Sequence, residues 1–166
     1  IFFASLAQVW RSCPGIYQSV LTVATRLPST ASQVDFQFTS GSSLETGGAI
    51  QLVLPHFSGS ALADVEEVGG CGSTHFAMAV ANSGSAIATF ALTAADATLA
   101  AHTSCTLRVA SSSVTTPSVG QPLNLSTRTV QQTGATTIAP ATLIESSSIG
   151  VQITFMFVAF NPDDKT

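Results

Sequence analysis

The chain has 166 residues, of which 45% are hydrophobic and only 8% are charged, and its formal net charge is −4. High hydrophobicity excludes a disordered chain, and five basic residues against nine acidic ones leave no positive surface for nucleic acid. No apolar run approaches the roughly 18 residues that a membrane-spanning helix requires. The surface must therefore be covered by small polar side chains, which 22 Ser and 21 Thr supply.

Seven segments alternate apolar and polar residues with the period of two that is typical of half-buried strands. In chain order, these predicted strands cover residues 34–38, 50–54, 76–80, 87–93, 105–109, 123–130 and 153–157. Turn-forming stretches of Gly, Ser and Pro separate them, and only residues 94–101 have a composition that favours a short helix. We therefore predict an all-β, antiparallel sandwich of seven to nine strands. Its core is expected to contain five side chains: Phe36, Phe38, Ile50, Leu52 and Leu54.

The pattern divides the chain into three parts. Residues 1–16 form an N-terminal apolar segment, which we interpret as a strand rather than the remnant of a signal peptide, and residues 17–148 form the sandwich. Residues 149–166 are either its final strand or the start of a second repeat, because residues 141–157 resemble residues 24–38 at an offset of about 118, the size of one sandwich domain. Alternatively, two strands of one sheet are similar because they have the same role.

Three cysteines are compatible with one disulfide and one remaining thiol, or with three buried thiols. Cys105 alternates in phase with Leu107 and Val109, so its side chain is expected to point inward, and Cys71 lies in a Gly-rich turn. We therefore predict a Cys71–Cys105 disulfide, with Cys13 left over.

One sequence for N-linked glycosylation is present. It begins at Asn124 and continues through Leu125 to Ser126, inside a polar stretch. The hydroxyl-rich surface, the predicted disulfide and this site together favour an extracellular or cell-surface location. Asn124 is therefore the candidate for glycosylation, and the sequence leaves open whether it carries a glycan.

The segment from Phe36 to Pro55 has an aromatic strand, a Gly47-Gly48 turn and a strand that ends in Leu54-Pro55. It resembles the Ig-like repeats of large secreted surface proteins of protists and algae. The resemblance implies an antiparallel Ig-like β-sandwich with a structural or adhesive role. It implies no catalytic residue.

No residue pattern predicts a catalytic centre or a bound cofactor. The three histidines, His56, His75 and His102, lack metal-binding spacing, and the many serines lack the setting that activates a nucleophile. An acidic cluster is expected to be a solvated loop rather than an acid–base pair; it consists of Asp64, Glu66 and Glu67. Three weak calcium candidates follow the last predicted strand: Asn161, Asp163 and Asp164. We therefore expect neither an enzyme nor a cofactor.

The last predicted strand is apolar on both faces, with Phe155 and Phe157 on one side and Phe160 on the other. Such a strand would promote aggregation if its edge were open, so we expect these residues, or residues 1–10, to contact another copy of the chain head-to-tail. The leading hypothesis is a non-enzymatic extracellular structural sandwich that assembles into a filament, cell-surface coat or wall. The alternatives are a carbohydrate-binding or adhesive module, for which Trp10 and Tyr17 are the candidate aromatics, and a viral capsid or fibre jelly roll.

Overall fold

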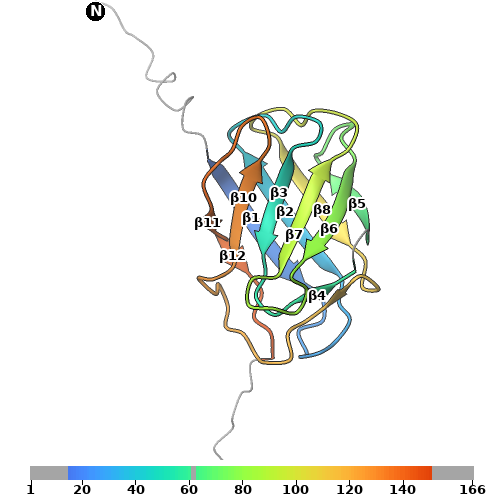
Figure 1. Cartoon of the computed structure of the whole chain (residues 1–166), viewed down its shortest axis with the longest axis vertical. Helices are drawn as coiled ribbons and strands as arrows, with labels where there is room; N and C mark the ends of the chain where they lie inside the picture. The colour runs from blue at the N-terminus through green and yellow to red at the C-terminus, as the bar shows by residue number, and fades with distance from the viewer. Residues whose placement is uncertain (1–14, 61–62, 151–166) are drawn as a thin grey trace, which may run out of the picture.

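The computed structural model describes residues 15–60 and 63–150, and this part of the chain forms a β-sandwich of two five-stranded sheets packed face to face (Figure 1). The predicted all-β sandwich is confirmed. Eight of the strands have five or more residues, which agrees with the seven to nine expected. The described part of the chain contains no helix, and so none that could cross a membrane.

The front sheet faces the reader in Figure 1. In spatial order its strands are β11 (Ala141–Thr142), β10 (Thr129–Thr133), β3 (Ala49–Val53), β7 (Thr89–Ala94) and β6 (Phe76–Ala81). The back sheet consists of β12 (Glu145–Ser146), β1 (Ile16–Val23), β2 (Val34–Ser40), β8 (Ser104–Val109) and β5 (Ala63–Gly69). A small separate sheet pairs β4 (Ser58–Gly59) with β9 (Val114–Thr115).

Strand β5 connects the two sheets. Its first two residues pair with β6 of the front sheet, and from Val65 onward it pairs with β8 of the back sheet. All strand pairs are antiparallel except β1 with β12, which is parallel. One continuous strand therefore holds the two sheets together at this edge of the sandwich.

The core lies between the sheets, because alternate residues of every long strand point inward. All five side chains predicted for the core are buried in one cluster. Phe38 of β2 stacks on Phe36 and meets Phe76 of β6 edge-on, with ring centroids 5.4 and 6.3 Å apart. Aromatic contacts thus join the back sheet to the front sheet, and the predicted register is confirmed.

Three local predictions were wrong. The strand expected at 123–130 begins only at Thr129, because Asn124 has a φ of 51° and Leu123 is 63% exposed; a left-handed residue interrupts a strand. The acidic cluster at 64–67 is not a loop but part of β5. Alternation did not reveal this strand, because Glu66 and Glu67 are both polar. In the structure, only Glu67 of the two pairs opposite a buried residue, Leu107. The helix-prone residues 94–101 are also not helical; within them, Leu99 forms a β-bridge to Leu44.

Candidate functional site

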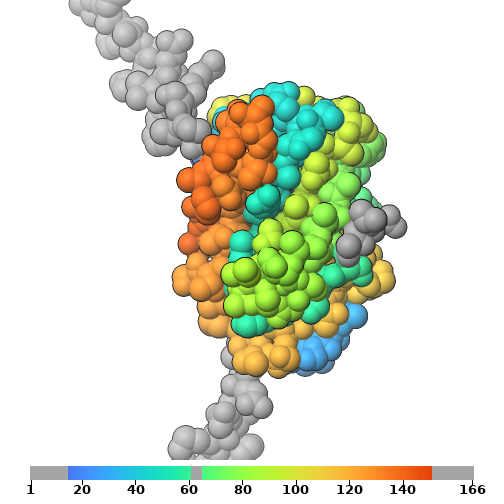
Figure 2. Space-filling view, in the orientation of Figure 1, coloured from blue at the N-terminus to red at the C-terminus, as the bar shows by residue number. Residues whose placement is uncertain are grey.

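Four neighbouring strands of the front sheet carry no charged residue on their outer face. Three cross-strand rows run from β10 through β3 and β7 to β6, and the row that contains Ala77 continues to Asp64 of β5. They contain Thr129, Val53, Thr89 and Ala81; Gln131, Gln51, Ala91 and Ala79; and Thr133, Ala49, Thr93 and Ala77. We call these twelve residues the uncharged face, and Figure 2 shows it toward the reader. Eleven of them are at least partly exposed, and Ala49 is buried. A surface of small neutral side chains suits a neutral partner, since binding it removes no charge from water.

Side-chain size changes across the uncharged face. On β6, at one side, all three outward positions are alanines, and on β10, at the other side, they are Thr129, Gln131 and Thr133. The two middle strands mix small and larger side chains. The side chains of this face therefore extend less far from the backbone of the sheet at β6 than at β10.

The outer face of the back sheet differs, because charged residues cross it in one row. Asp35 of β2 lies beside Arg108 of β8, which lies beside Glu66 of β5. Arg108 donates two hydrogen bonds of 2.8 Å to the Asp35 carboxylate, through Nε and Nη2. These hydrogen bonds hold the pKa of Asp35 below its usual value, and the same contact raises the pKa of Arg108. This face therefore presents a salt bridge where the uncharged face presents none.

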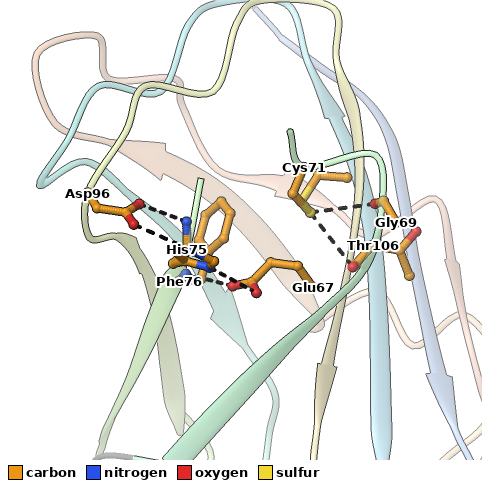
Figure 3. A network of polar contacts seen from close by, with 8 residues as sticks. Glu67, Gly69, Cys71, His75, Phe76, Asp96 and Thr106 are labelled. Carbon is orange, nitrogen blue, oxygen red and sulfur yellow. Dashed lines mark hydrogen bonds and ion pairs between the residues drawn. A yellow bond between two sulfur atoms is a disulfide. The ribbon is translucent and has the colours of Figure 1, made fainter. Parts of the chain in front are cut away.

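A polar cluster joins the ends of β5 and β6 (Figure 3). His75 Nδ1 lies 3.3 Å from Glu67 Oε2, and His75 Nε2 lies 3.7 Å from Asp96 Oδ2. Glu67 also accepts a hydrogen bond from the Phe76 backbone N–H, and Asp96 accepts one from the His75 N–H. The hydrogen bond to Glu67, together with the charges of both carboxylates, raises the pKa of His75.

This cluster is suited to fastening strand ends. The two ring nitrogens of His75 point in opposite directions, so one ion could not bind both nitrogens and draw in both carboxylates. Among the described residues, no group of three or more His, Cys, Asp or Glu side chains is placed to hold a metal ion. His56 and His102 lie elsewhere, each in a turn with a φ of 62°.

The Cys71–Cys105 disulfide is confirmed, with Cα atoms 4.5 Å apart, and Figure 3 shows Cys71 near Gly69 and Thr106. Cys105 is fully buried on β8, as its alternation with Leu107 predicted. A disulfide is consistent with an oxidising location. Cys13, the calcium candidates Asn161, Asp163 and Asp164, and the assembly candidates Phe155, Phe157 and Phe160 lie outside the described residues.

Arg128 is a buried cation that the sequence did not predict. Its guanidinium donates to the Ser147 carbonyl oxygen and, over 2.8 Å, to Gln121 Oε1, and it lies over the Phe57 ring. No described carboxylate pairs with it, and its Nε has no hydrogen-bond partner among the described residues. Burial lowers the pKa of Arg128 to about 10. Arg128 fastens the 121–128 loop to the segment around Ser147.

The glycosylation candidate Asn124 is exposed and lies beside the edge strand β12. Its backbone N–H donates to the Ser146 carbonyl oxygen over 3.1 Å, and its Oδ1 accepts the Ser146 N–H over 2.8 Å. These two hydrogen bonds cover the outer edge of β12 and fix the orientation of the Asn124 amide. The amide nitrogen, which is the atom that would carry a glycan, donates to no described residue.

Two exposed rings lie together at the start of β1. Tyr17 is 43% exposed and stacks on His102, with ring centroids 5.7 Å apart and planes 7° from parallel. Gly41 allows this position, because a Cβ there would lie 2.7 Å from the Tyr17 hydroxyl oxygen. The structure thus places one of the two predicted sugar-contacting aromatics on the surface; the other, Trp10, lies outside the described residues.

No family model, curated protein or solved structure matches this chain. Its function must therefore be argued from its own residues.

Proposed function

We propose that this chain is a non-enzymatic extracellular structural β-sandwich of Ig-like type that associates with copies of itself in a filament, cell-surface coat or wall. The observation that carries the proposal is the uncharged face, twelve outward residues on four strands without a charge. Soluble domains usually intersperse charges on their surfaces. The disulfide supports the extracellular part of the proposal.

The size difference across the uncharged face favours a second copy as the partner. If two copies face each other across a two-fold axis parallel to the strands, β6 of one copy lies opposite β10 of the other. The alanines of β6 then receive the larger side chains of β10, and Ala79 lies opposite the partner's Gln131 in the same row. Packed sheets interdigitate in this way at a separation of about 10 Å.

A single contact of this kind would be weak. Four strands about 4.8 Å apart and five residues of about 3.4 Å each give a face of roughly 300–400 Å², well below the roughly 800 Å² per partner of a standard interface. Such a pair is also closed, so growth of an assembly needs a second contact. The terminal residues Phe155, Phe157 and Phe160 remain the sequence-based prediction for it.

Cysteine crosslinking is the appropriate test, because it traps weak contacts. A chain carrying Ala79→Cys and Gln131→Cys should form disulfide-linked pairs under mild oxidation, and adding Ala91→Glu at the centre of the face should abolish them. Thr22→Cys with Glu66→Cys, which also lie at the two ends of a row across four strands but on the outer face of the back sheet, is the matched control and should stay unlinked between chains. Equal crosslinking on both faces, or crosslinks that survive Ala91→Glu, would count against pairing through the uncharged face.

Electron microscopy and light scattering of native material test the assembly itself. An ordered polymer is expected, and a monodisperse monomer at all accessible concentrations would overturn the proposal.

The second candidate function, a carbohydrate-binding or adhesive module, is favoured by the exposed Tyr17–His102 pair, since flat rings stack on sugars. Glycan-array binding that Tyr17→Ala removes would select it.

A further inference from the structure

An open groove runs beside the edge strand β12. It has a volume of about 390 Å³, which is within the usual range of small-ligand sites. Thr22 and Arg26 line it from the end of β1 and the turn that follows, and Asn124 and Leu123 line it from the loop before β10. Glu145 and Ser146 of β12 also line it, as do Val20, Leu21 and Ser147. The groove is thus assembled from three distant parts of the chain.

Several polar groups in the groove have no partner. The side chains of Thr22, Arg26 and Glu145 are exposed and form no hydrogen bond or ion pair with other described residues. The hydroxyl of Ser146 also lacks a hydrogen-bond partner among them, but it is buried and so is not open to a ligand in the groove. The groove therefore offers both donors and acceptors to a ligand.

The chemistry of the lining points to a saccharide. Arg26 and Glu145 carry opposite charges, so the lining is neutral overall and favours a neutral ligand over a phosphate, which Glu145 would repel. The guanidinium of Arg26, the carboxylate of Glu145 and the hydroxyl of Thr22 match vicinal sugar hydroxyls, which both donate and accept. Val20 and the 63% exposed Leu123 add apolar surface for the C–H groups of a sugar ring.

Asn124 is the residue to which such a saccharide would be attached. It lines the same groove, and the two hydrogen bonds to Ser146 fix its side chain there while its amide nitrogen donates to no described residue. We propose that the groove holds the first sugars of a glycan attached to Asn124, and that the glycan thereby stabilises the pairing of β12 with β1. The inference rests on the extracellular location in the proposed function, but not on self-association.

The test compares two proteins made in a eukaryotic secretory host. Ser126→Ala removes the glycosylation sequence yet keeps Asn124 and both of its hydrogen bonds, so it separates the glycan from the asparagine. Intact mass should show a glycan on the wild type only. Amide exchange of residues 144–147 should be slower in the glycosylated protein, by roughly threefold or more, with the strands of the front sheet unchanged. Absence of a glycan, or equal exchange in both proteins, would overturn the inference.

Two further arms locate the sugar and identify its source. Arg26→Ala with Glu145→Ala, made in both backgrounds, should remove the glycan-dependent protection, and protection that survives would mean that the sugar lies elsewhere. Unglycosylated protein titrated with di-N-acetylchitobiose should show saturable NMR shifts confined to the groove. Shifts without protection by the attached glycan would contradict the attached source. Crosslinking of the uncharged face should be the same in all these variants, so failure here and failure of the proposed function are distinguishable.

Discussion

The outer faces of the two sheets have the same backbone geometry but opposite electrostatic character. The front sheet presents twelve small, uncharged side chains, whereas a row of Asp35, Arg108 and Glu66 crosses the back sheet. Their inner faces are alike, because both contribute aromatic and aliphatic residues to one core. Packing therefore constrains the inner positions equally, and only the outer positions are free to differ.

Under the proposed function, the two faces have different tasks. Burying the Asp35–Arg108 pair against a partner would remove both charges from water, which costs several kcal/mol per ion before attraction is regained. Burying the uncharged face carries no such cost. A partner is thus expected on the front sheet, and solvent on the back sheet. The following predictions, from the largest effect to the smallest, test this comparison.

The shared core should make the two sheets equally sensitive to truncation on the inside. Phe38→Ala in the back sheet should lower the free energy of unfolding by roughly 3–5 kcal/mol, and Leu92→Ala in the front sheet by roughly 2–5 kcal/mol; both side chains are buried. Urea unfolding measures both. Outward controls, Thr93→Ala and Thr106→Ala, should stay within about 0.5 kcal/mol of the wild type. A loss under 1 kcal/mol for Leu92→Ala would mean that the front sheet does not share the core.

The disulfide should support the back sheet more than the front sheet. The double variant Cys71→Ala with Cys105→Ala should lose about 3–4 kcal/mol, because the bridge closes a loop with a sequence separation of 34 residues in the unfolded chain. Chemical denaturation gives this value. Hydrogen exchange should also rise more in β5 and β8 than in β3 and β10. Uniform acceleration across all four strands would contradict the local part of this prediction.

The salt bridge of the back sheet should show itself at acid pH. Because the pKa of Asp35 is lowered in the folded protein, its contribution to stability is present above the unfolded value and is lost as pH falls through the folded one. Asp35→Asn should therefore flatten the stability profile below about pH 4, by about 1 kcal/mol or less for a partly exposed pair. Thermal unfolding across pH 2–6, roughly, measures it, and Gln37→Asn on the same strand is the control. An unchanged stability profile at acid pH would show that the Asp35–Arg108 pair contributes nothing to the stability of the folded protein.

The smallest effect is expected at His75, which lies where β5 and β6 meet. The pKa of His75 is raised in the folded protein, so its contribution is present below the unfolded value of about 6.5 and is lost as pH rises through the folded value. His75→Gln should remove this loss of stability from the pH profile of thermal unfolding, whereas His56→Gln should leave the loss in place. NMR titration of the His75 ring should give a pKa above the unfolded value of about 6.5; a lower one would reverse the sign.

The sequence predicted the features that depend on alternation. Phe36 and Phe38 repeat with a period of two beside polar neighbours, and this pattern is sufficient to place them in the core. Cys105 shares the phase of Leu107, so its inward orientation followed, and the Gly-rich turn at Cys71 made the disulfide predictable. Alternation did not predict the strand that contains Glu66 and Glu67, because consecutive polar residues are typical of a loop.

Only the tertiary structure decided which distant residues meet. Asn124 looked like part of a strand until its left-handed backbone placed it beside Ser146, and the groove needs Arg26 and Glu145 to approach from 119 positions apart (145 − 26). Arg128 has the sequence environment of a surface cation, yet it is buried, because the loop before it folds onto the segment around Ser147. Local sequence patterns indicate whether a side chain is expected to be exposed or buried. They do not record where the chain brings its polar groups together, since such long-range contacts depend on the pairing of the sheets.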